Sequence, residues 1–185
     1  MLVRLIYVNF GKTFYMDTID ALLTRRSVRK YNNTEVPQHL TEELIKCGMY
    51  APSACNKQPW HFIIIRDRST LNQIADFHPS AKMLKDAPCA ILVCGDELKA
   101  HDKGYWPVDC SAATQNILLA AHACGLGACW IGIYPREERI KNLKQLMNLP
   151  EHIHAFSLIA LGYYNENLPQ PGNRFNASRI HQNKW

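Results

Sequence analysis

Residues 88–94 form an uninterrupted apolar run, Pro-Cys-Ala-Ile-Leu-Val-Cys. A run of this length without alternating polar residues is typical of a strand that is buried on both faces. Such a strand needs packed layers on both sides of its sheet. The chain has 185 residues, of which 47% are hydrophobic and 20% charged, so it is long and apolar enough to supply those layers.

Helical and strand patterns surround this run in an order that limits the topology. We expect helices over residues 17–23, 38–50, 69–77, 107–124 and 135–147, and further strands over residues 62–66, 128–133 and 155–163. Two helices precede the first core strand, which is not the order of a simple βαβ chain. The sequence therefore predicts the α+β class, with a mixed central sheet wrapped by helices.

Local signals support several of these helix boundaries. Asp17 and Ser69 are placed to cap the first amides of two helices. Pro135 suits the start of a helix, and Gly125 is a natural stop after the longest one. That longest helix is rich in small residues over its first half. This composition indicates a buried central helix that another backbone can approach closely, as at a subunit interface.

The chain is expected to divide at residue 16. Residues 16–185 contain no obvious linker and read as one domain. Residues 1–15 are apolar but are interrupted by Arg4 and lack a small-residue cleavage site, so they make a poor signal peptide. An added strand and a poorly ordered extension both fit this segment, and we favour the extension.

Four cations and a hydroxyl group lie close together in the segment Arg25-Arg26-Ser27-Val28-Arg29-Lys30-Tyr31, here called the basic segment. Guanidinium groups bind phosphate oxygens with paired, charge-assisted hydrogen bonds, so this segment suits a phosphate. Complementation of a helix dipole is the simpler explanation, but it does not need a third arginine. The net charge of +5 is mild and the other cations are scattered, which disfavours nucleic acid as the ligand.

A second polar stretch leads into the strand predicted at residue 62. It reads Pro52-Ser53-Ala54-Cys55-Asn56-Lys57-Gln58-Pro59-Trp60-His61-Phe62 and is here called the amide loop. Its Asn and Gln side chains offer donors and acceptors on a turn bounded by proline, which suits a flat polar heterocycle. Satisfaction of the loop backbone by the same side chains is the alternative. We interpret the two stretches as holding one molecule, flavin mononucleotide (FMN).

The seven cysteines do not pair in a recognisable way. Their number is odd, no Cys-x-x-Cys occurs, and several lie in apolar runs. This usage favours reduced thiols and a cytoplasmic location. The histidines and cysteines show no metal-ligand spacing, so no metal is predicted. No apolar run reaches membrane-spanning length, so no membrane partner is predicted either.

The basic segment and the amide loop resemble the two flavin motifs of the nitroreductase family. The helix over residues 109–121, the segment Gly125-Leu126-Gly127-Ala128-Cys129-Trp130-Ile131-Gly132 and the sequence Ala160-Leu161-Gly162-Tyr163 are similar to that family too. The resemblance runs from about residue 16 to residue 185. It implies an FMN-dependent oxidoreductase that uses NADH or NADPH, and a domain-swapped type of homodimer with two flavin sites between the subunits.

The resemblance also implies roles for particular residues. Arg25, Arg26 and Ser27 match phosphate contacts, and Arg29 matches the residue at the flavin pyrimidine edge. Pro52, Ser53 and Asn56 match residues around the ring and ribityl chain, and Trp130, Ile131 and Gly132 match backbone groups near N5. Arg174 matches a phosphate contact from the tail, with Arg179 as the alternative. Many members carry an acidic residue where Gly132 stands, so only backbone contacts are expected there.

Three functions fit these features. The first is transfer of hydride from NAD(P)H through flavin N5 to nitroaromatics, quinones or similar flat acceptors by ping-pong exchange, with no essential protein acid or base. In this reaction Arg29 stabilises the negative charge of the reduced ring. The second is another reaction of an FMN enzyme with the same fold, such as dehalogenation or flavin fragmentation. The third is a non-enzymatic flavin-binding module.

Overall fold

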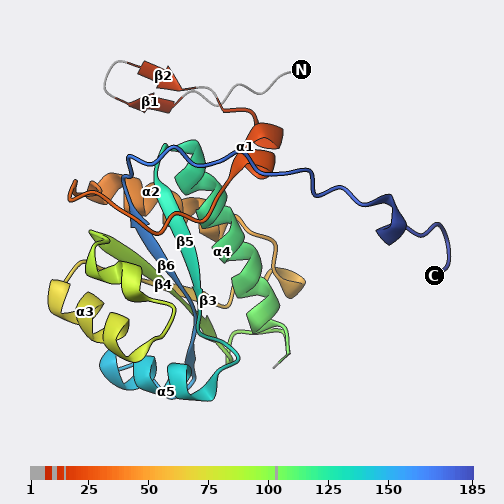
Figure 1. The fold of residues 1–185 in the computed structure, drawn as a ribbon. Coiled ribbons are helices and arrows are strands. Elements are labelled where there is room, and N and C mark those ends of the chain that lie inside the picture. The colour runs from red at the N-terminus through yellow and green to blue at the C-terminus, as the bar shows by residue number, and fades with distance from the viewer. Residues whose placement is uncertain (1–6, 10–11, 15, 103) are drawn as a thin grey trace.

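The computed structural model describes residues 7–9, 12–14, 16–102 and 104–185, and a four-stranded sheet lies at its centre (Figure 1). The sheet has the order β3–β4–β6–β5, and each neighbouring pair is antiparallel. Its strands are β3 (Trp60–Ile65), β4 (Cys89–Asp96), β5 (Gly127–Gly132) and β6 (Ile153–Gly162). β5 is therefore an edge strand of this sheet.

Helices cover both faces of the sheet (Figure 1). The helices are α1 (Thr18–Thr24), α2 (Gln38–Met49), α3 (Arg68–Phe77), α4 (Trp106–Ala123) and α5 (Glu137–Leu146), with single turns η1 (Ala54–Asn56), η2 (Lys82–Lys85) and η3 (Ala177–Arg179). Ile91 and Val93 of β4 pack with α2 and α4, whereas Ala90 and Leu92 pack with α3 and α5. All eight residues of β4 are buried, which confirms the strand predicted to be covered on both faces.

The α+β class and the wrapping by helices are confirmed. The predicted mixed sheet is corrected to an antiparallel one, because all three pairings of its strands are antiparallel. The described chain adds one parallel bridge, between Ser27 and Ala128, outside the four strands. Neighbouring strands of the sheet, such as β4 and β6, run in opposite directions. Strand directions depend on how distant segments pair, which apolar runs do not specify.

Some helix boundaries differ from the predicted ones. Asp17 caps α1 as predicted, because its carboxylate accepts a hydrogen bond from the Ile19 amide at 2.8 Å. The cap of α3 is Asp67 rather than Ser69, since Asp67 accepts from the Thr70 amide at 2.7 Å. Helix α5 begins at Glu137 and not at residue 135, because Arg136 before it is still extended.

The ends of the chain lie outside the central sheet. Tyr7–Asn9 (β1) and Lys12–Phe14 (β2) form an antiparallel hairpin, and residues 1–6, 10, 11 and 15 lie outside the described residues. The division of the chain at residue 16 stays a prediction. Residues 163–169 stay on the body, where Glu166 pairs with Lys30 and the Pro169 carbonyl accepts from Arg26. Beyond them the chain runs away from the body as an extended arm (Figure 1). Within the described ranges, no helix is both long and apolar enough to cross a bilayer.

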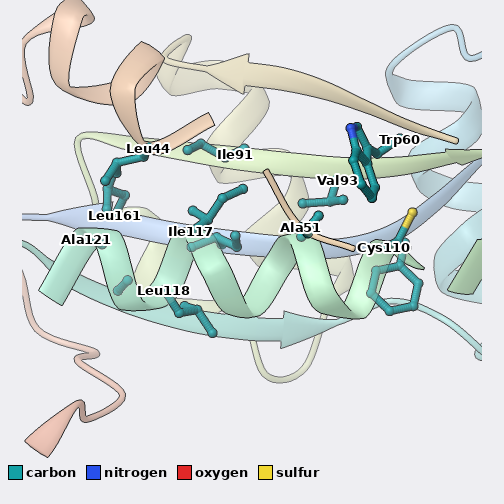
Figure 2. Packing of buried hydrophobic residues seen from close by; sticks show 14 of the residues in the cluster. Leu44, Ala51, Trp60, Ile91, Val93, Cys110, Ile117, Leu118, Ala121 and Leu161 are labelled. Carbon is teal, nitrogen blue, oxygen red and sulfur yellow. The ribbon is translucent and has the colours of Figure 1, made fainter. Parts of the chain in front are cut away.

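Replacing Ile117 by alanine is expected to destabilise the fold by about 2–5 kcal/mol, since the change leaves a cavity between α4, α2 and β4. Ile117 is fully buried and points toward Leu44 and Ile91 (Figure 2). Its Cγ1 atom would lie 2.9 Å from a Cβ atom on Gly48, so α2 is already packed closely against it. Urea unfolding of the variant measures the loss. Leu98→Ala, at a site 74% exposed, should stay within about 0.5 kcal/mol. An equal loss in both variants would contradict the packing described here.

Candidate functional site

The basic segment lies against the start of β5. Ser27 forms its bridge with Ala128, and the Val28 amide donates to the Ala128 carbonyl at 3.0 Å. A Cβ atom on Gly127 would lie 2.8 Å from the Val28 side chain, so the glycine allows this close approach. Tyr31 adds an anchor, because its hydroxyl donates to the Val28 carbonyl at 2.6 Å. The segment is thereby held along the edge of the sheet.

Within the part of the chain that the structure describes, two of the four cations of the basic segment remain available for an anion. The Arg26 guanidinium donates to the Pro169 carbonyl at 2.6 Å, and Lys30 pairs with Glu166 at 2.8 Å. Arg25 and Arg29 instead influence Cys129 on β5. Burial raises the pKa of the Cys129 thiol, and the charges of Arg29 and Arg25 and a hydrogen bond from Ser27 oppose that rise. Arg25, Ser27 and Arg29 therefore converge on one region, whereas the Arg26 side chain is bound elsewhere.

Beyond its contact with the basic segment, the outer edge of β5 exposes backbone groups. In an antiparallel strand, the N–H and C=O of one residue point to the same side, and the side alternates along the strand. The Ala128 carbonyl points outward to Val28, so the backbone groups of Trp130 and Gly132 point outward too. Ile131 is 1% exposed and packs into the core, so its side chain cannot serve a ligand.

Gly132 ends this edge and is held by two side chains. Its carbonyl accepts from Arg139 at 2.7 Å and lies 3.0 Å from Nε2 of His78. A Cβ atom built on Gly132 would meet nothing within 4 Å, so open space lies beside the backbone at this point. We did not predict His78 or Arg139 from the sequence. His78 is 54 positions away from Gly132, and neither residue belongs to a recognisable motif.

The amide loop adopts a strained turn. Cys55, Asn56 and Gln58 all have left-handed backbone conformations, with φ of 49°, 53° and 49°. The Ser53 hydroxyl accepts from the Gln58 amide at 3.0 Å, and the Asn56 side-chain oxygen accepts from the Gln58 side chain at 2.9 Å. Part of the polar chemistry of this loop therefore satisfies the loop itself. Pro52 and Asn56 are exposed, and Ser53 is half-buried.

Asp109 of α4 fixes this loop to the body and was also missed in the sequence. Its carboxylate accepts from the Ala54 amide at 3.0 Å, and the carboxylate is almost completely buried. Its second oxygen, Oδ2, is buried without a hydrogen-bond partner in the structure described. The loop is therefore anchored to the first turn of α4.

A single chain does not bring the basic segment and the amide loop together. The loop is tied to Asp109 in the first turn of α4, whereas Thr24, next to the basic segment, contacts His122 in the last turn at 2.8 Å. Thirteen residues of helix separate these contacts, a rise of about 20 Å. Arg174 is exposed and belongs to the arm that leaves the body.

Cys55 is the thiol most open to reagents in this region. It is exposed, whereas burial raises the pKa of Cys89 to about 11 and that of Cys94 to about 12. A charged thiol reagent at pH 7 should therefore modify Cys55 first, because thiolates react and the buried thiols stay protonated. Mass spectrometry identifies the fast site, and Cys55→Ser should abolish the fast phase. Rapid labelling of Cys94 instead would contradict the packing of β4.

Comparison with known proteins places the chain in a family. The sequence matches the Nitroreductase family over residues 22–78 and 78–163. It is 49% identical over 177 residues to a protein of Methanothermobacter thermautotrophicus named "Putative NADH dehydrogenase/NAD(P)H nitroreductase", covering 95% of this chain and 91% of that one. The chain belongs to the nitroreductase family of oxidoreductases, which confirms the resemblance.

Solved structures agree with this assignment. A protein of Parabacteroides distasonis with the same name is 43% identical, with a TM-score of 0.87, and the match covers 91% of this chain and 98% of that one. A protein of Desulfovibrio desulfuricans named "putative nitroreductase", solved in complex with FMN, is 28% identical with a TM-score of 0.78. The match covers 91% of this chain and 97% of that one. The chain thus shares its fold with a protein that holds FMN.

Proposed function

We propose that the chain is an FMN-dependent oxidoreductase that carries electrons from NADH or NADPH to flat acceptors such as nitroaromatics and quinones. The observation that carries this proposal is a pair of cations beside the open edge of β5, Arg25 and Arg29, for which the described residues offer no ion-pair partner. The FMN complex of the relative from Desulfovibrio desulfuricans supports the choice of cofactor.

The residues along this edge fit a flavin. Arg25 and the exposed Ser27 would hold the phosphate, since a guanidinium and a hydroxyl group both donate to phosphate oxygens. Arg26 would contribute through its backbone, because its guanidinium is bound to Pro169. Trp130, Ile131 and Gly132 would lie along the ring, with the outward backbone of Gly132 facing N5 and open space beside it.

A second copy of the chain would complete the site. Pro52, Ser53 and Asn56 of the amide loop lie at the far end of α4 from Arg25, so in a homodimer the partner would supply them. Three apolar side chains of α1 are exposed by 51–67%, namely Ile19, Leu22 and Leu23. A largely apolar groove of about 530 Å³ lies beside them between α1, α2 and α4. Exposed apolar surface of this kind is typical of a subunit interface.

The exposed arm is also explained by a homodimer. Beyond Pro169 the chain leaves the body and carries the exposed Phe175, Ile180 and Trp185 (Figure 1). An arm of this kind can cross to a partner chain and exchange contacts with it. Arg174 would then reach a phosphate from the arm, with Arg179 as the alternative.

The chemistry divides between the cofactor and the chain. When bound, FMN would supply hydride transfer between NAD(P)H and the acceptor, with N5 as its reactive atom. Arg29 would stabilise negative charge on the pyrimidine side of the ring, as a preorganised cation should. The other named residues bind and orient, and none is needed as an acid or base. The chain therefore acts by holding the ring with one face open for donor and acceptor in turn.

The test is an anaerobic reduction series. The purified protein should be yellow, and NADH or NADPH should bleach the flavin absorbance. A nitroaromatic or a quinone should then restore it. Bleaching without recovery by either acceptor would favour another reaction of this fold, and flavin binding without bleaching would favour a binding module. A protein that stays colourless after incubation with FMN would overturn the proposal.

A further inference from the structure

We propose that His78 and Arg139 are positioning residues that fix the end of β5 against the flavin by holding the Gly132 carbonyl. This inference rests on the proposed function, because it concerns the backbone group that would face N5. Neither residue would touch the cofactor. Both would act through Gly132.

The contacts define a two-donor clamp on one oxygen. A carbonyl oxygen has two lone pairs, and here both are used. Arg139 donates to the Gly132 carbonyl at 2.7 Å. The Ser80 amide donates to Nδ1 of His78 at 3.2 Å, so Nδ1 is an acceptor and the proton is assigned to Nε2. Nε2 then donates to the Gly132 carbonyl at 3.0 Å.

The surroundings keep this clamp in one state. His78 is fully buried, and burial, with a smaller contribution from the charge of Arg139, lowers its pKa. The ring therefore stays neutral near pH 7 and keeps its Nε2 proton directed at the carbonyl. The hydrogen bond to the Gly132 carbonyl raises the pKa of His78, but this effect is smaller than the lowering caused by burial. His78 follows α3 and Arg139 lies in the first turn of α5, so both donors come from the layer opposite to α4.

Gly132 needs an external anchor because little else restrains it. Glycine lacks a Cβ atom and accepts many backbone conformations, and nothing lies within 4 Å of the position that a Cβ would take. It is also the last residue of an edge strand, where ladder contacts end. Beyond Gly132 the pairing of β5 with β6 is shifted by one residue. The Phe156 carbonyl accepts from the Tyr134 amide, whereas the regular register would pair it with the Ile133 amide. The clamp therefore fixes the peptide plane that joins Gly132 to Ile133, and with it the end of the strand.

The experiment compares two arginines at the start of the same helix. Arg139→Ala removes the donor to Gly132. Arg136→Ala removes an exposed charge nearby, at the N-cap of α5, and serves as the control. The rate constant of flavin reduction at saturating NADH or NADPH should fall about tenfold in Arg139→Ala, because a misplaced donor costs rate rather than binding. FMN affinity should change less than about twofold in both variants, since the phosphate end is held elsewhere.

Two results would overturn this inference. One is an Arg139→Ala variant that is reduced at the rate of the parent protein. The other is an equal loss of rate in Arg136→Ala, which would point to charge alone. Thermal unfolding shows whether each variant is folded, and Arg139 is half-buried on an outer helix, so a folded variant is expected. Failure of the proposed function is distinguishable, because it would appear as absent FMN binding in the parent.

Discussion

Replacing Arg25 by alanine is expected to weaken FMN binding about 10- to 100-fold, because one charge-assisted contact with the phosphate is lost. Arg25 is half-buried at the end of α1, where its amide donates to the Ala21 carbonyl at 3.1 Å. The backbone of Arg25 is therefore fixed at the end of α1. The charge of Arg25 opposes the rise that burial causes in the pKa of the Cys129 thiol. Titration of the apoprotein, followed by quenching of flavin fluorescence, measures the affinity.

Lys30 supplies a matched control within the same segment. Its side chain is 80% exposed and its ammonium pairs with Glu166, so Lys30→Ala removes a charge without touching the proposed phosphate site. An FMN affinity close to that of the parent is expected for this variant. If Arg25→Ala retained the affinity of the parent, or lost no more than Lys30→Ala, then Arg25 would not contact the cofactor.

Replacing Ala120 by arginine is expected to convert the protein to a monomer and to abolish most FMN binding. Ala120 is half-buried and lines the groove between α1, α2 and α4. A long charged side chain there would place an unpaired cation in an apolar subunit interface, which is strongly unfavourable. Because the site would draw residues from both copies, dissociation should also remove the cofactor. Sedimentation equilibrium measures the mass, and flavin absorbance measures the occupancy.

Lys141→Glu, at an exposed position on α5, controls for the change of surface charge. It should remain dimeric and yellow. A monomeric parent protein that binds FMN would contradict the shared site, and so would an Ala120→Arg variant that is monomeric but retains FMN.

The helices and strands were predictable where local signals are strong. The run at residues 88–94 has no polar break, and β4 is indeed buried along its whole length. Gly125 follows α4 with φ of 73°, a left-handed conformation that favours glycine. The strand order β3–β4–β6–β5 was not predictable, because it depends on pairing between segments far apart in the chain. The predicted cap of α3 was wrong because Asp67 and Ser69 are both suitable capping residues and lie within one turn of each other.

The candidate site, like the fold, was predictable only where its residues are close together in the sequence. The basic segment could be recognised because its cations are adjacent in sequence, and the structure adds that Arg26 and Lys30 are bound elsewhere. His78, Arg139 and Asp109 could not be recognised. Each acts on a backbone group that only the fold brings near, at Gly132 or Ala54. Backbone contacts of this kind leave no motif, because any donor or acceptor of suitable length can make them.

Complementation between two defective chains tests most directly whether the two motifs meet across a dimer. Arg25→Ala and Asn56→Ala should each weaken FMN binding in the homodimer. Coexpression with two different tags isolates the heterodimer, in which one site carries both changes and the other carries neither. That heterodimer should bind about one FMN per dimer with the affinity of the parent, against about two for the parent itself. If instead both of its sites bind as weakly as those of the separate variants, then Arg25 and Asn56 do not meet across a dimer.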